Sequence, residues 1–135
     1  GHVLKFSKRA QLFPMLYHGR AASSQGKLVP IRDPEHFGPI VDYRVPQALR
    51  TLGILRYDEN LANRIDDGML IVPESAMEIE IRIATTKATL MLLEAINAIR
   101  QEPITMVELD YVLWSMGRAP SFPQSKHHYT YTTAY

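Results

Sequence analysis

The feature that most constrains this chain is a run from Ser75 to Gln101 that can form one long helix. Ser75 and Glu78 have the spacing of a capping box, in which side chains and backbone amides bond reciprocally at the helix start. One face collects Met77, Ile81, Ala84, Ala88, Leu92, Ala95 and Ile99, and another collects Ile79, Ile83, Leu90 and Leu93. Two apolar faces predict a central helix packed on both sides. Glu78 and Arg82, one turn apart, should form an ordinary surface ion pair of about 0.3–0.5 kcal/mol.

The first part of the chain predicts a helix followed by a loop. Residues 5–17 have apolar side chains at helical spacing, and Pro14 predicts a kink or a break near Phe13 because proline has no amide hydrogen. The expected apolar stripe consists of Phe6, Ala10, Phe13 and Tyr17. Residues 18–39 are rich in glycine, serine and proline, so we expect a long surface loop there.

Two short helices should follow this loop. The first lies within residues 41–53, where Gly53 suits a left-handed C-terminal cap. Its expected apolar stripe is Val45, Leu49 and Leu52. The second covers residues 59–66, and Asp58 suits its N-cap. The segment after Arg118 alternates tyrosine and threonine and holds prolines, which predicts an extended C-terminal tail laid over the helices.

Composition sets the outer bounds on fold and function. A chain of 135 residues with 46% hydrophobic and 21% charged residues is typical of one globular domain. No apolar run reaches the roughly 18 residues that a membrane span requires. The net charge of +1 argues against tight binding to a polyanion such as nucleic acid. The absence of cysteine excludes disulfides and thiolate chemistry and fits a reducing compartment, so we expect a cytoplasmic protein.

Motifs for metal or cofactor binding are not apparent. The sequence has no glycine-rich phosphate loop, no nucleophile elbow and no zinc-protease or EF-hand pattern. His127 and His128 are adjacent, so on an extended tail they would point apart and form a poor metal pair. We therefore expect neither a metal nor an organic cofactor.

One carboxylate stands out because it lies in an apolar helix. Thr105 and Glu108 form a capping box, so a helix should begin at Met106, and Gly117 should end it. Its expected core stripe is Leu109, Val112, Leu113 and Met116. Asp110 falls on the adjoining stripe near Trp114, where desolvation would raise its pKa, as is common at active sites. The alternative is a structural aspartate satisfied by an arginine or by backbone donors.

Several segments in a fixed order resemble one protein family. They are Lys8-Arg-Ala-Gln11, the stretch from Asp42-Tyr-Arg-Val-Pro-Gln to Leu55, Glu80-Ile-Arg-Ile-Ala-Thr85 and Leu109-Asp-Tyr-Val-Leu-Trp114. Together with the tail, these segments resemble the queuosine salvage proteins, which are queuosine 5'-phosphate N-ribosylhydrolases. The resemblance implies a mainly α fold, similar to helix-hairpin-helix DNA glycosylases, with a long central helix and an extended C-terminal tail.

The resemblance has limits that bear on the site. The family's proteins are longer, so residues 1–135 should be a single helical domain equivalent to the C-terminal half. The histidine and aromatic groups that the N-terminal half brings to the pocket are absent from this chain. Ile40 and Val41 stand where the family has a phenylalanine and a small residue. The N-terminal half is accordingly an expected partner.

The resemblance also implies roles for single residues. Asp110 matches the nucleophile or stabiliser of the cationic sugar in the transition state. Asp42 matches a substrate-binding position, with a helix N-cap as the structural alternative, and Val41 would add backbone and van der Waals contact. Tyr111 is a weaker candidate for base or ribose contact, since a tyrosine on a helix face is more often simply core. Lys8 would contact the 5'-phosphate, and its alternative is a solvated basic turn.

The sequence therefore predicts hydrolysis of queuosine 5'-phosphate, which releases queuine for tRNA modification salvage. The substrate is a small modified nucleotide, and we expect no membrane association and no stable nucleic-acid binding. The alternative from another class is a non-catalytic helical module, in which Asp110 is structural and the apolar faces of the long helix bind a protein partner.

Overall fold

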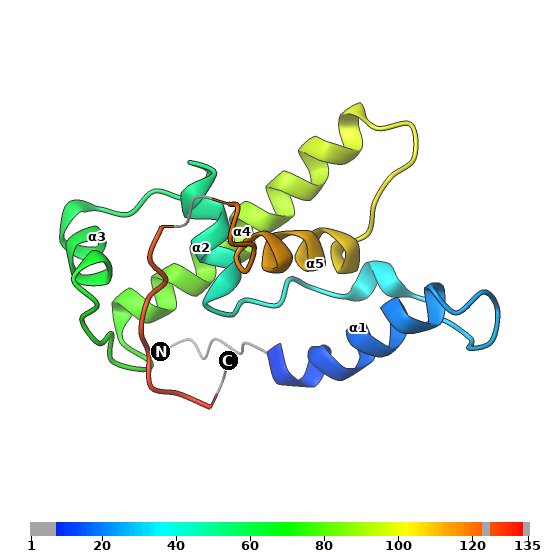
Figure 1. Cartoon of the computed structure of the whole chain (residues 1–135), viewed down its shortest axis with the longest axis horizontal. Coiled ribbons are helices and arrows are strands. Elements are labelled where there is room, and N and C mark those ends of the chain that lie inside the picture. The colour runs from blue at the N-terminus through cyan, green and yellow to red at the C-terminus, as the bar shows by residue number, and fades with distance from the viewer. Residues whose placement is uncertain (1–7, 123–124, 134–135) are drawn as a thin grey trace.

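The structure is a computed structural model that describes residues 8–122 and 125–133. The described chain is mainly helical, as predicted, and has no β-strand beyond one isolated bridge between Leu70 and Tyr129. The helices are α1 (Lys8–Ala22), a short 3-10 turn η1 (Pro34–His36), α2 (Arg44–Thr51), α3 (Glu59–Asp66), α4 (Ala76–Ile99) and α5 (Met106–Met116). Figure 1 shows α4 as the long diagonal helix, with α2 and α5 beside it and α1 and α3 at opposite ends.

The main hydrophobic core lies where α2, α4 and α5 meet. Its buried members are Val45, Ala48, Leu49, Leu55, Leu109 and Leu113. Ala84, Ala88 and Leu92 of α4 pack against them, and a second cluster of Leu61, Ile65, Ile71 and Ile81 joins α3 to the start of α4. These two clusters make α4 the central helix, because it is the element common to both.

The prediction that α4 is packed on two apolar faces is confirmed only in part. On the second face, Ile79 and Leu93 are half-buried and Leu93 packs against the core, whereas Ile83 and Leu90 are exposed. Ile99 at the helix end is almost fully exposed. Val112 of α5 is also half exposed, because α5 packs against its neighbours through Leu109 and Leu113. Amphipathic periodicity gives the faces of a helix, but only the neighbouring helices decide which of them is covered.

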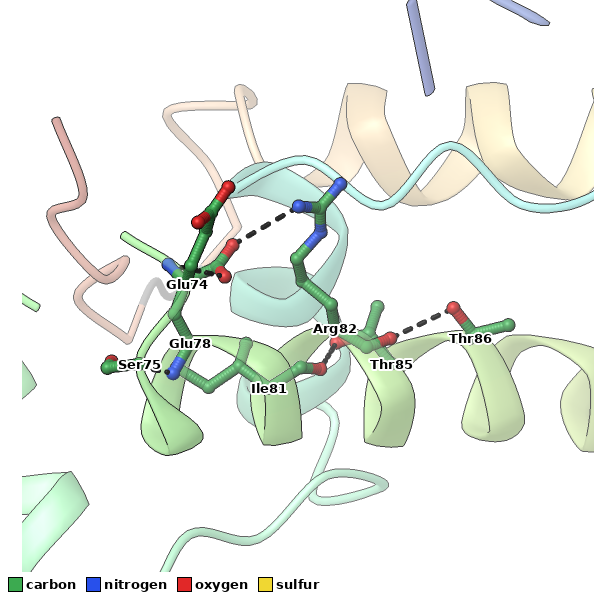
Figure 2. A network of polar contacts seen from close by, with 7 residues as sticks. All are labelled: Glu74, Ser75, Glu78, Ile81, Arg82, Thr85 and Thr86. Carbon is green, nitrogen blue, oxygen red and sulfur yellow. Dashed lines mark hydrogen bonds and ion pairs between the residues drawn. The ribbon is translucent and has the colours of Figure 1, made fainter. Parts of the chain in front are cut away.

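The buried side of α4 is partly polar. Thr85 Oγ1 donates to the Ile81 carbonyl at 2.6 Å and Thr89 Oγ1 donates to the Thr85 carbonyl at 2.8 Å. Figure 2 shows Glu78 and Arg82 extending from the same side of α4, with their charged ends 3.3 Å apart. Their side chains are only 4% and 7% exposed, so the predicted surface ion pair is in fact a buried one.

Residues that start and stop helices act largely as predicted. Asp58 caps α3 by accepting from the amides of Asn60 and Leu61, and the Thr105–Glu108 capping box of α5 is complete. The Ser75 half of the α4 capping box is present, since Ser75 Oγ accepts from the Glu78 amide at 3.4 Å.

The turn after α2 explains one misassigned core residue. Gly53 has a φ of +74°, and the amides of Ile54 and Leu55 both donate to the Leu49 carbonyl, which is the expected left-handed cap. This turn brings Leu55 into the core and leaves Leu52, the predicted stripe residue, partly exposed.

The first helix differs most from its prediction. It continues through Pro14 without a break and extends to Ala22, so the start of the predicted loop is helical. Pro14 lacks an amide hydrogen, so α1 forgoes one backbone hydrogen bond at this position without breaking. Its buried residues are Met15 and Ala21, whereas Ala10, Phe13 and Tyr17 of the predicted stripe are exposed. Phe6 lies outside the described residues.

The tail lies along the helices in an extended conformation, as predicted. Ser125 is bonded on both sides, because its amide donates to Thr51 Oγ1 and its carbonyl accepts from Gln47 Nε2 at 2.7 Å. The Ile71 amide donates to the Tyr129 carbonyl at 2.7 Å. His128 is buried, and burial together with the charges of His127 and Arg82 lowers its pKa to about 4.

Breaking the buried pair should cost far more than breaking an exposed one. Arg82→Met leaves the Glu78 carboxylate without its cation, so we expect a loss of about 3–5 kcal/mol in the free energy of unfolding. Arg50→Met, which removes the partner of the half-exposed Asp66, should cost at most about 1 kcal/mol. Urea denaturation of both variants measures the two losses in free energy of unfolding. Equal losses would show that burial does not raise the cost of removing the arginine.

Candidate active site

Asp110 lies on the inner side of α5, where its residue surface is 8% exposed. The extended segment that leads from η1 into α2 runs alongside α5 (Figure 1). The Ile40 amide in this segment donates to Asp110 Oδ1 at 2.8 Å. The carboxylate is thus held by a backbone donor from a part of the chain 70 residues away, and Oδ2 makes no hydrogen bond within the described residues.

Burial dominates the electrostatics of this carboxyl group. Desolvation raises the pKa of Asp110 to about 7, the bond from the Ile40 amide lowers it, the Asp42 carboxylate raises it and the Lys8 ammonium lowers it. The raised pKa predicted from the apolar helix is therefore confirmed. The same balance of charges shows that Asp42 and Lys8 lie close enough to act on Asp110. At neutral pH this group is poised between its two protonation states.

Asp42 is also buried, and it caps α2. Its Oδ1 accepts from the amides of Arg44 at 2.7 Å and Val45 at 3.1 Å, which is the bonding pattern of an N-cap. The structural role considered for Asp42, that of a helix N-cap, is therefore confirmed. Both bonds end on one oxygen, and within the described ranges Oδ2 has no such partner. Capping therefore does not preclude a second partner for this carboxylate.

The segment between η1 and α2 is held from two sides. The Gly38 amide donates to Gln11 Oε1 of α1 at 2.8 Å, and the Ile40 amide donates to α5. Sequence reasoning missed both Gln11 and the Ile40 amide. Gln11 lies one turn after Lys8 in the first signature segment, so its shared helix face with Lys8 was the available signal. The role of the Ile40 amide could not be predicted, because the pattern of side chains in a sequence does not show which backbone amide will bond to a distant carboxylate.

The other predicted site residues fall into two groups. Val41 is buried beside Asp42, and Lys8, at the start of α1, is half-buried and within electrostatic reach of Asp110. Tyr111 is 65% exposed and does not join this group. Arg9 donates to the Thr133 carbonyl at 3.2 Å, which ties α1 to the tail. The structure therefore gathers Asp110, Asp42, Val41 and Lys8 in one place.

A close approach of α2 and α5 keeps the two aspartates together. Arg44 Nη1 donates to the Gly117 carbonyl at 3.1 Å, so this side chain ties α2 to the end of α5. A Cβ at Gly117 would lie 3.1 Å from the Arg44 carbonyl oxygen. Gly117 ends α5 with a φ of −62°, so glycine is needed there for this approach rather than for a left-handed cap.

Within residues 8–122 and 125–133, no group of three or more histidine or acidic side chains is arranged to hold a metal ion. In the same ranges, none of the helices combines the length and hydropathy needed to cross a membrane.

Comparison with known proteins places this chain in a family. The family model described as queuosine salvage protein matches residues 1–135. A relative from Dictyostelium discoideum is 33% identical over 139 residues, and one from Sphaerobacter thermophilus is 33% identical over 135 residues. Each match covers 100% of this chain and 41% of the relative, so the chain spans about two-fifths of their length.

A third relative, from Schizosaccharomyces pombe, is 34% identical over 77 residues, which covers 57% of this chain and 21% of that protein. All three relatives carry the name queuosine 5'-phosphate N-glycosylase/hydrolase. This chain, with its helical fold and paired buried aspartates, belongs to the queuosine salvage protein family.

Charge substitutions beside Asp110 should shift its pKa in opposite directions. Asp42→Asn removes a neighbouring anion, so the pKa of Asp110 should fall below about 7, and the asparagine oxygen can still cap α2. Lys8→Gln removes a cation and should raise the pKa. Titration of the Asp110 carboxyl carbon by NMR measures both shifts. Two shifts of the same sign would contradict the arrangement of charges described here.

Proposed function

We propose that this chain supplies the catalytic carboxylate for hydrolysis of the N-glycosidic bond of queuosine 5'-phosphate, which releases queuine for salvage into tRNA. The observation that carries the proposal is the buried Asp110, with a pKa raised to about 7, beside a second buried aspartate, Asp42. Family membership supports it, as do the names of the relatives.

The reaction needs an anion at this point. As the bond between the ribosyl carbon and the base nitrogen breaks, positive charge develops on the sugar ring, and a preorganised carboxylate stabilises it. Water then forms the new bond to that carbon, and the departing nitrogen gains a proton. The Ile40 amide fixes Asp110 Oδ1, which leaves Oδ2 for the sugar or for the attacking water. Asp110 therefore acts in its ionised form, as nucleophile or as stabiliser.

The chemistry of the leaving group explains why the barrier must be lowered mainly by stabilising the sugar. Queuine is a deazapurine, so it lacks the ring nitrogen that hydrolases of ordinary purine nucleosides can protonate. Less of the barrier can be removed at the base, and more must be removed by stabilising the cationic sugar. A carboxylate held in a desolvated site suits that task, because electrostatic interactions are stronger where water is excluded.

The neighbouring residues take binding roles in this proposal. Asp42 Oδ2 accepts hydrogen bonds from the guanine-like edge of the base or pairs with its cationic aminomethyl group, while Oδ1 continues to cap α2. Val41 lines the base with backbone and apolar contact. Lys8 makes a charge-assisted contact with the 5'-phosphate. Tyr111 is largely exposed and stands apart from these residues, so its contact with base or ribose has the least support among the binding roles.

The proposal extends to the architecture of the whole protein. We assign the described helices to the C-terminal half of a glycosylase-like helical domain, since the chain spans 41% of its relatives. The likeness to helix-hairpin-helix DNA glycosylases is supported by α2 and α3, two short helices joined through the turn at Gly53.

Removal of the Asp110 charge should abolish hydrolysis. The chain is incubated with queuosine 5'-phosphate, alone and co-expressed with the preceding portion of the Sphaerobacter relative, and queuine release is followed chromatographically. Asp110→Asn should lower the rate at least about 100-fold, while Asp66→Asn, at an exposed carboxylate on α3, should not. For the unsubstituted protein, kcat/KM should rise as the pH rises through about 7.

Normal turnover by the Asp110→Asn variant would overturn the assignment of that residue. No release in either preparation would overturn the proposed reaction, and a failure to bind both queuine and its nucleotide would favour the non-catalytic alternative.

The same variant should be more stable than the unsubstituted protein at neutral and alkaline pH. The pKa of Asp110 is raised by folding, so its ionisation destabilises the native state increasingly from about pH 4 to pH 7. Asp110→Asn removes this cost, which is on the order of a few kcal/mol above pH 7. Chemical denaturation at pH 5 and pH 8 should show the larger gain at pH 8. A variant that is less stable at pH 8 would contradict the raised pKa.

A further inference from the structure

An apolar patch lies uncovered on α1 and the loop that follows it. We define the α1 patch as Phe13, Leu16, Tyr17, Leu28 and Val29. Phe13, Leu16 and Val29 are 77%, 63% and 75% exposed, respectively. Figure 1 shows α1 and its loop at one end of the molecule, away from α3 and the start of α4. Such a concentration of large exposed apolar side chains marks an interaction surface.

The patch is continuous across two segments of the chain. Phe13, Leu16 and Tyr17 share one face of α1 because they are three and four residues apart. The loop folds back against this face, since Tyr17 Oη donates to the Val29 carbonyl at 3.0 Å. The Leu28 amide donates to Ser24 Oγ at 2.9 Å, which holds the turn between them. The opposite side of α1 is already used, because Met15 and Ala21 are buried.

The formally charged side chains of α1 and of the loop as far as Arg32 are all cationic. Residues 8–32 contain five cations and no aspartate or glutamate. The cations are Lys8, Arg9, Arg20, Lys27 and Arg32. A second copy of this chain would bring like charges together across a self-complementary contact, which is unfavourable. The patch instead suits a partner that presents apolar side chains with acidic residues around them.

The lengths of the relatives identify that partner. This chain matches the C-terminal portion of proteins of which it covers 41%, so their unmatched portion precedes the residues equivalent to α1. A segment joined to the chain before residue 1 is seven residues from the start of α1 and is held near this helix at high effective concentration. We propose that the α1 patch is the docking surface for this preceding portion of the queuosine salvage proteins, whether it is carried on the same chain or a separate one.

Docking at the α1 patch would place the partner next to the candidate site. Phe13 follows Lys8 by five residues, about 7.5 Å along the axis of α1. A bound segment that covers Phe13 therefore borders the group formed by Lys8, Asp42 and Asp110. The inference goes beyond the proposed reaction and does not depend on it, because it rests on exposure, charge and the extent of the match.

The test measures assembly rather than activity. The 135-residue chain, tagged for purification, is co-expressed with the portion of the Sphaerobacter relative that precedes the matched residues. We expect the two to purify as a one-to-one complex. Phe13→Asp and Val29→Asp should each weaken the complex at least about tenfold, because they place a charge in its apolar centre. Ile99→Asp is the matched control, since Ile99 is 87% exposed at the end of α4 and should leave binding unchanged.

Several results would overturn the inference. These are the absence of a complex on co-expression, equal effects of the Phe13 and Ile99 substitutions, self-association of the chain alone that the Phe13 substitution abolishes, and binding to anionic lipid vesicles in place of the co-expressed portion. A complex that depends on the α1 patch but releases no queuine would support the docking surface and overturn the proposed reaction. Queuine release without a patch-dependent complex would support the reaction and overturn the docking surface.

Discussion

The hydrogen bond from the Ile40 amide to Asp110 is the interaction on which the arrangement of the candidate site depends. It joins two parts of the chain that are 70 residues apart, and it places a backbone donor against a carboxylate that burial has deprived of water. One amide does not offset the full cost of desolvation, so the pKa of the carboxyl group stays near 7. The fold thus holds this group at the edge of ionisation, which a purely structural aspartate does not require.

The segment that carries Ile40 serves the fold and the site at once. Asp42 begins α2 by capping it, and α2 forms the core with α4 and α5, so the carboxylate beside Asp110 is fixed by the same contacts that stabilise the protein. On the other side, α4 buries the Glu78–Arg82 pair and places Arg82 within electrostatic reach of His128 in the tail. Burial of these charges is costly, and their arrangement is maintained only while all the partners remain in place.

Membership of the queuosine salvage family gives this arrangement a chemical context. The chain spans 41% of the length of its relatives, and it exposes large apolar side chains on α1 and on α4. The candidate site lies beside one of these surfaces, at the start of α1. A site shared between two parts of a protein would account for both observations.

The sequence by itself determined the helix ends, because capping depends on a few adjacent residues: Asp58, the Thr105–Glu108 box and Gly53 all act as their local pattern predicts. It also indicated the raised pKa of Asp110, since a carboxylate in an apolar helix is expected to be desolvated. Tertiary structure alone decided that Glu78 and Arg82 are buried, that Leu55 replaces Leu52 in the core and that α1 continues through Pro14. The bonds to Asp110 and Gly38 likewise join segments distant in sequence, and packing between such segments leaves no trace in local periodicity.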